Sequence, residues 1–238
     1  MLKIKALLFD VFGTVVDWRT GVAGEVKKIA NKYGITIDSY AFADSWRAEY
    51  QPSMEKIRMG NRSFKILDIL HEENLKKIAS QYHLDQISKD DFEYLVTCWH
   101  RLPGWPDSSE GLSKLKKKFI IATQSNGNIA LMVNMAKHSN LNWDVILGAE
   151  VTGHYKPEPE AYLKACGALN LKTQECLMVA AHEDDLAAAS KQGMKTAFVY
   201  RPLEFGEEKR FNNIEVNDKK NWDFRATDFL DLAQQLGC

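Results

Sequence analysis

Four short polar segments each follow an apolar run of the chain, and they hold the side chains best suited to chemistry. They span residues 10–14, 123–127, 154–157 and 182–185. Carboxylates, hydroxyls, a lysine and a histidine can bind a small polar molecule and attack or deprotonate it. Taken singly, each side chain has a structural explanation, such as a helix cap or a turn. Together, at the ends of apolar runs, they indicate an active site.

The apolar runs have the pattern of strands buried on both faces of a parallel sheet. They cover residues 4–9, 119–123, 145–147, 176–181 and 196–200, and helical patterns lie between them at 109–118, 129–138, 158–169 and 185–193. This alternation predicts an α/β fold with a doubly wound, mostly parallel, Rossmann-like sheet. Ligands of such sheets bind outside the carboxyl ends of the strands, which is where the polar segments lie.

Residues 17–100 interrupt the alternation, because they show helical patterns only. Apolar side chains recur at helical spacing over residues 25–33, 39–47, 62–81 and 90–99, and two prolines and a glycine follow at 103–106. We therefore predict an all-helical cap domain over 17–100, inserted into a core domain formed by 1–16 and 101–238.

The order of the polar residues resembles that of the haloacid dehalogenase superfamily. The matching stretches are FDVFGT at residues 9–14, SNGN at 125–128 and YKPEPEAY at 155–162, followed by Asp185. The resemblance covers essentially the whole chain, including the helical insertion. It implies a core domain of this superfamily under a cap domain.

Two departures decide which branch of the superfamily the chain resembles. Phosphatases of the superfamily usually carry a second Asp two residues after the first, as the leaving-group acid, and here that position is Phe12, which transfers no proton. Their usual magnesium carboxylate falls at Ala181. The chain is instead similar to (S)-2-haloacid dehalogenases of type II. That resemblance implies hydrolysis of short 2-haloacids to 2-hydroxyacids through an aspartyl ester, with no metal and no cofactor.

The resemblance also implies roles for the reacting groups. Asp10 attacks the carbon that bears the halogen, and Lys156 keeps Asp10 ionised. Asp185, together with Lys156, orients or activates the water that hydrolyses the ester, and Tyr162 supports this network. Phe12 helps to desolvate Asp10.

Binding roles follow from the same resemblance. Thr14, Ser125 and Asn126 position Asp10 or bind the substrate carboxylate. Arg47 lies in a W-R-x-x-Y stretch of the predicted cap, at residues 46–50, and binds the departing halide. An arginine is always charged and so suits anion binding.

The fourth motif departs from the best-known dehalogenases. It reads A-A-H-x-x-D-L at residues 180–186, so His182 stands where those enzymes resemble Asn, and R-P-x-E follows at 201–204, as in a subset of dehalogenase-like proteins. A histidine that titrates near neutral pH is a candidate hydrolytic base. A hydrogen-bonded loop histidine is the alternative.

Composition excludes several other classes of protein. With 31 Lys and Arg against 32 Asp and Glu, the net charge is −1, so the chain has no global attraction to nucleic acid or anionic membranes. Its four cysteines form no metal or disulfide pattern and indicate free thiols in a reducing compartment, for which we expect the cytoplasm. The expected partner is a small haloacid, and a homodimer is left open. The alternatives are a magnesium-dependent phosphatase of a small phosphomonoester and a non-catalytic binding protein.

Overall fold

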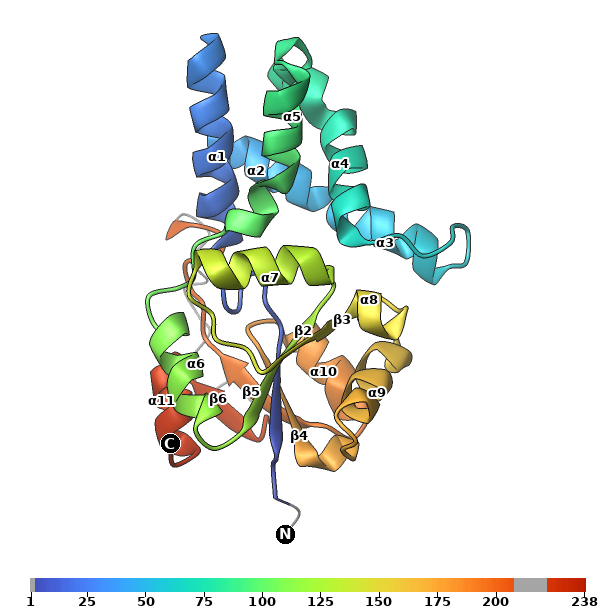
Figure 1. Cartoon of the computed structure of the whole chain (residues 1–238), viewed down its shortest axis with the longest axis vertical. Helices are drawn as coiled ribbons and strands as arrows, with labels where there is room; N and C mark the ends of the chain where they lie inside the picture. Colours follow the sequence, from blue (N-terminus) through green and yellow to red (C-terminus); the bar gives the residue numbers. More distant parts are fainter. Residues whose placement is uncertain (1–2, 208–221) are drawn as a thin grey trace.

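A parallel sheet of six strands forms the centre of the computed structural model, which describes residues 3–207 and 222–238 (Figure 1). Its order is β3-β2-β1-β4-β5-β6. The strands are β1 (Ala6–Phe9), β2 (Ile120–Ser125), β3 (Val145–Gly148), β4 (Cys176–Ala180), β5 (Lys195–Val199) and β6 (Phe224–Ala226). The predicted doubly wound, Rossmann-like α/β class is confirmed.

Helices cover both faces of this sheet. The core helices are α6 (Ser108–Lys116), α7 (Ile129–His138), α8 (Ala149–Thr152), α9 (Pro159–Ala168), α10 (Glu183–Lys191) and α11 (Phe229–Gln235), with a 3-10 turn η4 (Thr173–Glu175). Alternate side chains of β1 point to opposite faces. Leu7 and Phe9 join a cluster with α6, α7 and α11, whereas Ala6 and Leu8 pack with α9 and α10.

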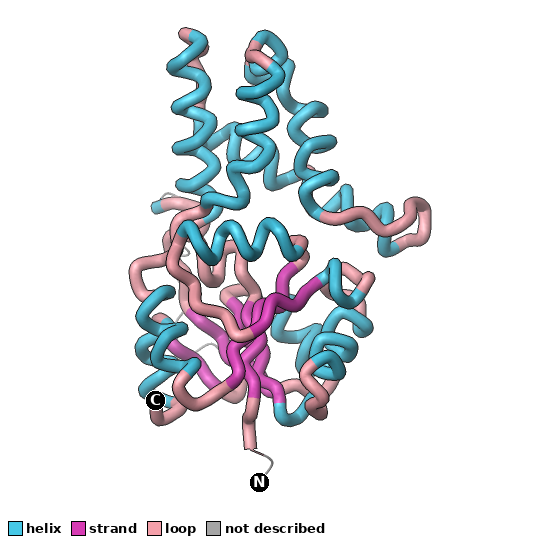
Figure 2. The backbone as a smooth tube through the Cα atoms, in the orientation of Figure 1, coloured by secondary structure: helices cyan, strands magenta, loops and turns pink. Residues whose placement is uncertain are grey.

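The regular elements between β1 and α6 are all helices, as predicted. They are α1 (Trp18–Tyr33), α2 (Ser39–Ala48), α3 (Tyr50–Arg58), α4 (Leu67–Ile78) and α5 (Lys89–Val96), with 3-10 turns η1 (Ala79–Tyr82), η2 (Leu84–Gln86) and η3 (Thr97–Arg101). Figures 1 and 2 show these helices gathered beyond the carboxyl ends of the strands. We call the part from α1 to η3, residues 18–101, the cap.

Local signals in the sequence begin and end the cap helices. Asp17 and Asp38 precede α1 and α2, and their carboxylates accept hydrogen bonds from backbone amides of the first turn. Gly34 ends α1 in the left-handed conformation that glycine tolerates, with φ of 66°. Side-chain caps of this kind mark where α1 and α2 start.

The boundaries of several elements differ from the prediction. The helix expected over 62–81 begins at Leu67 and changes to 3-10 geometry at Ala79, and the strand expected over 4–9 begins at Ala6. Helices α3, α8 and α11 and strand β6 were not predicted. Strand β6 has only three residues, too few to show a periodicity.

Aromatic packing fastens the cap to the core. Phe12, in the loop after β1, meets the ring of Trp99 edge to face at 5.8 Å and that of Tyr50 at 6.4 Å. Trp99 in turn stacks on Trp18, at 6.3 Å between ring centroids. The buried side chains of the cap and of one sheet face thereby form one continuous hydrophobic cluster.

Polar contacts add to this attachment. Arg58 of α3 donates to the backbone carbonyl of Lys156 (3.0 Å), and the hydroxyl of Tyr155 donates to the carbonyl of Lys65 (2.6 Å). The cap therefore contacts the third polar segment at two adjacent residues, Tyr155 and Lys156. Within the two described ranges, no helix has the length and apolarity needed to cross a membrane.

Candidate active site

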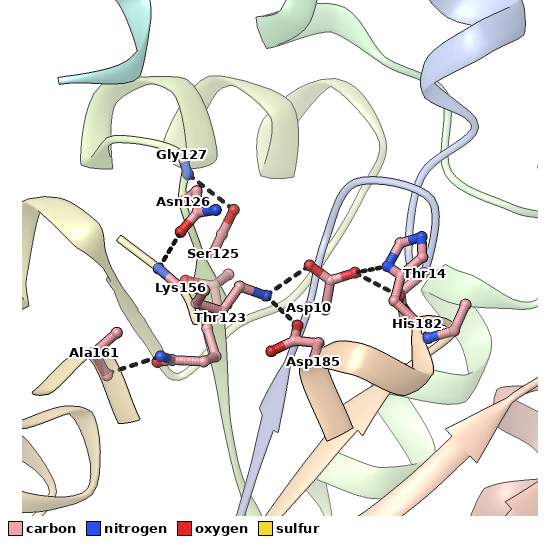
Figure 3. Close-up of polar contacts among 12 residues, drawn as sticks. Asp10, Thr14, Thr123, Ser125, Asn126, Gly127, Lys156, Ala161, His182 and Asp185 are labelled. Carbon is pink, nitrogen blue, oxygen red and sulfur yellow. Dashed lines mark hydrogen bonds and ion pairs between the residues drawn. The ribbon is translucent and has the colours of Figure 1, made fainter. Parts of the chain in front are cut away.

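Asp10 lies at the carboxyl end of β1, between β2 and β4, and is the centre of the site (Figure 3). It is only 6% exposed. Its Oδ1 accepts a hydrogen bond from Lys156 Nζ (2.9 Å), and its Oδ2 accepts one from Thr14 Oγ1 (2.7 Å). His182 Nδ1 lies 3.0 Å from the same Oδ2. Three groups from three separate segments thus hold one buried carboxylate.

The charge state of Asp10 follows from these neighbours. Burial acts to raise the pKa of Asp10, but the positive charge of Lys156 and the hydrogen bonds from His182 and Thr14 act more strongly in the other direction. The net effect lowers the pKa of Asp10 far below its ordinary value. The carboxylate is therefore ionised at any pH at which the protein works, as a nucleophile must be.

Lys156 joins Asp10 to the second buried carboxylate of the site, Asp185. Its Nζ contacts Oδ2 of Asp185, and Tyr162 donates its hydroxyl proton to Oδ1 of Asp185 (2.6 Å). Burial acts to lower the pKa of Lys156, yet the two carboxylates raise it overall, so the ammonium stays charged. Burial raises the pKa of Asp185, and the nearby charge of Asp10 adds to this effect while Lys156 opposes it.

The second polar segment, residues 123–127, fixes the loops of the site by accepting hydrogen bonds from their backbone amides. Asn126 Oδ1 accepts from the backbone amide of Lys156 (2.9 Å), and Ser125 Oγ accepts from the amide of Gly127 (3.0 Å). Asn126 lines the cavity described below, whereas Ser125 is buried, at 1% exposed, and is not among the residues that line it. Thr14 also serves the loops, since its hydroxyl accepts from the amide of Ala181 (2.9 Å).

Arg47 reaches the same cavity from the cap. Its guanidinium carbon lies 4.0 Å from the ring centroid of Tyr50, 5.4 Å from that of Trp18 and 5.8 Å from that of Phe12. Its Nη1 is buried and has no hydrogen-bond partner among the described residues. A buried donor left unpaired costs free energy unless a ligand satisfies it. The arginine is thus held ready for an anion.

His182 lies between two carboxylates, which corrects one expectation. Its Nδ1 faces Asp10, and its Nε2 lies 2.9 Å from Oε2 of Glu204. Burial acts to lower the pKa of His182, but hydrogen bonds to Asp10 and Glu204 outweigh it and raise the pKa to about 10. The prediction that His182 titrates near neutral pH is therefore wrong for the resting protein, where it is an imidazolium.

Glu204 is the site residue to which sequence reasoning assigned no role. It follows β5, is 4% exposed, and belongs to the R-P-x-E stretch. Its Oε1 accepts from the indole Nε1 of Trp18 (3.0 Å), a residue 186 positions earlier. The motif itself was the only signal in the sequence, because nothing local predicts a contact over that separation.

A cavity of about 190 Å³ brings these groups together. Its walls include Asp10, Lys156, His182, Glu204 and, from the cap, Arg47. Three cationic side chains thus lie beside the four carboxylates of its lining, those of Asp10, Asp184, Asp185 and Glu204. The cavity suits a small anion with a short apolar part.

The donor atoms around Asp10 do not fit a magnesium ion. Mg²⁺ requires six oxygen ligands in octahedral geometry. Both oxygens of Asp10 and both of Asp185 are engaged by Lys156, Thr14, His182 or Tyr162. In residues 3–207 and 222–238, no group of three His, Cys, Asp or Glu side chains is arranged to hold a metal.

The imidazolium should contribute pH-dependent stability. A group whose pKa is raised on folding stabilises fully below its unfolded value, near 6.5, and loses that contribution as the pH rises through about 10. We expect the free energy of unfolding of the wild type to fall by on the order of 3 kcal/mol relative to that of His182→Asn over this pH window. Urea unfolding between pH 6 and 10 measures it. The exposed His138→Asn is the control, and a pH-independent difference for His182→Asn would contradict the assignment.

A capped α/β hydrolase is the class of protein that this sheet, helical insertion and strand-end site define. Residues 4–193 match the family model described as haloacid dehalogenase-like hydrolase. The chain belongs to the haloacid dehalogenase-like hydrolase family.

Individual relatives extend the comparison. The solved structure of the defluorinating L-2-haloacid dehalogenase Rha0230 is similar, with 43% identity, a TM-score of 0.93, and coverage of 99% of this chain and 96% of that one. The (S)-2-haloacid dehalogenase 1 of Pseudomonas sp. (strain CBS-3) is 27% identical, over 84% of this chain and 86% of its own. The phosphoglycolate phosphatase of Aquifex aeolicus (strain VF5) is 26% identical, over 82% and 84%.

Proposed function

We propose that this protein hydrolyses the carbon–halogen bond of short 2-haloacids, giving 2-hydroxyacids through an aspartyl ester without a metal ion. One observation carries the proposal. A buried, ionised carboxylate, Asp10, shares a small cavity with a guanidinium, Arg47, that has an unpaired donor. The two groups are the nucleophile and the halide receptor that this reaction needs. The similarity to the dehalogenases Rha0230 and that of Pseudomonas supports the same reading.

The first step is a displacement at carbon. An oxygen of Asp10 forms a bond to C2 of the substrate while the carbon–halogen bond breaks, and the halide leaves with the electron pair toward Arg47. Lys156 reduces the repulsion between Asp10 and the substrate carboxylate. Halide is a weak base and needs no proton, so the apolar Phe12, 2% exposed, is compatible with this step. We assign the pocket loop at Asn126 to the substrate carboxylate.

The second step hydrolyses the ester. A water molecule attacks the carboxyl carbon of Asp10, the bond from that carbon to the substrate oxygen breaks, and the 2-hydroxyacid leaves. The oxygen of the water becomes one of the two carboxylate oxygens of Asp10. Two groups that line the same cavity are candidates to accept the proton of this water, Asp185 and His182. Their surroundings distinguish them, as argued in the next subsection.

Phosphate transfer is the rival reaction, since a phosphatase is among the relatives. A phosphoryl group in transfer needs a cation to neutralise its charge. The oxygens of Asp10 and Asp185 are already engaged, so they are not free to bind such a cation. Phe12 supplies no proton for the leaving group. These observations favour the haloacid reaction.

Halide release distinguishes the two reactions directly. We expect chloride or fluoride from chloroacetate, fluoroacetate or one enantiomer of 2-chloropropionate, at a rate that excess chelator leaves within about 2-fold, because no step is routed through a metal. Magnesium-dependent release of phosphate from small phosphomonoesters, with no halide from any haloacid, would overturn the proposal.

A further inference from the structure

Glu204 is a buried carboxylate in the loop that follows β5. Its carboxylate is buried between the indole of Trp18 in the cap and the imidazole of His182. Glu204 also packs closely against the loop that carries Asp10, because a Cβ added to Gly13 would lie 2.1 Å from Oε1 of Glu204. Gly13 has a φ of 86° and no side chain, so the loop that carries Asp10 leaves room for this carboxylate.

The two ring nitrogens of His182 therefore have different partners. Nε2 faces Glu204, which stays a carboxylate throughout the reaction, whereas Nδ1 faces Asp10, which does not. When Asp10 becomes an ester, Nδ1 loses its anionic partner but Nε2 keeps its own. The proton on Nδ1 is then the one that is released. The remaining tautomer has its lone pair on Nδ1, beside the carboxyl carbon that water must attack.

We propose that Glu204 is the positioning residue that makes His182 the base of ester hydrolysis. The inference rests on the proposed function, because it concerns that reaction's second step. Glu204 holds the proton on Nε2 and fixes the ring with Nδ1 toward Asp10. A structural precedent is the carboxylate that orients the histidine of a hydrolytic triad.

The protons balance over the cycle. Ester formation releases the halide, and the Nδ1 proton of His182 passes to solvent. Neutral His182 then takes one proton from the attacking water and gives it to the departing hydroxyacid oxygen. The second proton of that water, left on the new carboxyl group of Asp10, returns to Nδ1. The sum is haloacid plus water giving hydroxyacid, halide and one proton.

Asp185 is less suited to take this proton. Both of its oxygens are engaged, one by Lys156 and the other by the hydroxyl of Tyr162. Asp185 keeps both of these partners when Asp10 is esterified, whereas His182 loses the carboxylate that its Nδ1 contacts. The charged groups that face His182 are Asp10 and Glu204, while Arg47 and Asp184 line the same cavity.

The test separates the two chemical steps in Glu204→Gln. A glutamine has one acceptor oxygen for the two donors that Glu204 serves, and it carries no charge. We expect a halide burst close to one per site, slowed less than 10-fold, followed by ester hydrolysis slowed about 100-fold. Rapid-quench halide measurement and the intact mass of the protein ester report the two steps. Glu25→Gln is the matched control, a buried carboxylate of α1 that pairs with Arg101.

A second variant tests that Glu204 acts through His182. In a His182→Asn background, Glu204→Gln should slow hydrolysis by less than 3-fold more, because its partner is gone. The pH profile of ester decay in Glu204→Gln should also shift to lower pH, and Glu204→Asp should restore part of the rate. A merely structural role does not shift the pH profile.

The outcomes distinguish this inference from the proposed function. If the wild type releases no halide, the proposed function fails and the inference fails with it. If the wild type turns over but Glu204→Gln slows both steps equally, or slows hydrolysis equally in the His182→Asn background, only the inference is overturned. Should Glu204→Gln not fold, the comparison of His182→Asn with the wild type decides, since equal rates of ester decay would also overturn it.

Discussion

Asp10→Asn is expected to abolish halide release, by about 10⁴-fold or more, while the protein keeps its fold. An amide has no negative charge with which to displace a halide. Asparagine nearly matches aspartate in shape, so the hydrogen bond from Thr14 and the packing of the loop can persist. Steady-state halide release at saturating haloacid measures the loss, and circular dichroism checks the fold. Asp223→Asn, a carboxylate that pairs with Lys195 on β5, is the matched control.

Oxygen labelling also tests whether Asp10 is the nucleophile. In a single turnover of the wild type in ¹⁸O-water, the label should enter Asp10, and the first hydroxyacid released should carry the original carboxylate oxygen. Label in the product after that first turnover, with none in Asp10, would mean that water attacks the substrate carbon directly. In that event Asp10 would be a general base and the ester would not exist.

Lys156→Met should have the second largest effect, because it leaves Asp10 and Asp185 buried without the charge between them. Breaking a buried ion pair by removing one partner typically costs about 3–5 kcal/mol. We also expect halide release to fall by about 10³-fold, since the substrate carboxylate would then approach two carboxylates that have lost the ammonium they share. Urea unfolding and halide release measure the two effects. Lys164→Met, on the exposed side of α9, is the control.

The pH dependence of that variant has a definite sign. Without Lys156, the buried pair is expected to hold a proton more tightly than it does unfolded, so its pKa is raised on folding. A raised pKa contributes stability below the unfolded value, near 4, that is lost as the pH rises. The deficit of Lys156→Met against the wild type should therefore be smaller at pH 5 than at pH 7.5. A deficit that grows on acidification would contradict this account.

The sequence predicted the sheet and the strand-end site because both depend on short, contiguous stretches of residues. Continuous apolar runs mark buried strands, and α7 spans the same residues, 129–138, in the prediction and in the structure. Parallel strands bring their carboxyl ends to one edge, so Asp10, Lys156 and Asp185 meet without any further information.

What the sequence could not show depends on contacts between distant segments. The charge state of His182 is set by two carboxylates, and the nearer of them in the chain is 22 positions away. Helix α3 carries Pro52, which blurs its signal, although proline is tolerated in a first turn. The pairing of Trp18 with Glu204 joins cap and core through tertiary structure alone. The domain boundaries at 16 and 100 stay a prediction, as do the cytoplasmic location and the homodimer.

The place of Phe12 limits how the parts of this protein can be exchanged. This ring belongs to the loop that carries the nucleophile, yet its neighbours Tyr50 and Trp99 belong to the cap. A chimaera that joined this core to a relative's cap would lose the aromatic packing around Phe12. The loop that carries Asp10 would then lose its contacts with the cap. Core and cap are therefore not interchangeable modules. Redesign of one for a larger substrate has to carry the matching aromatic residues of the other.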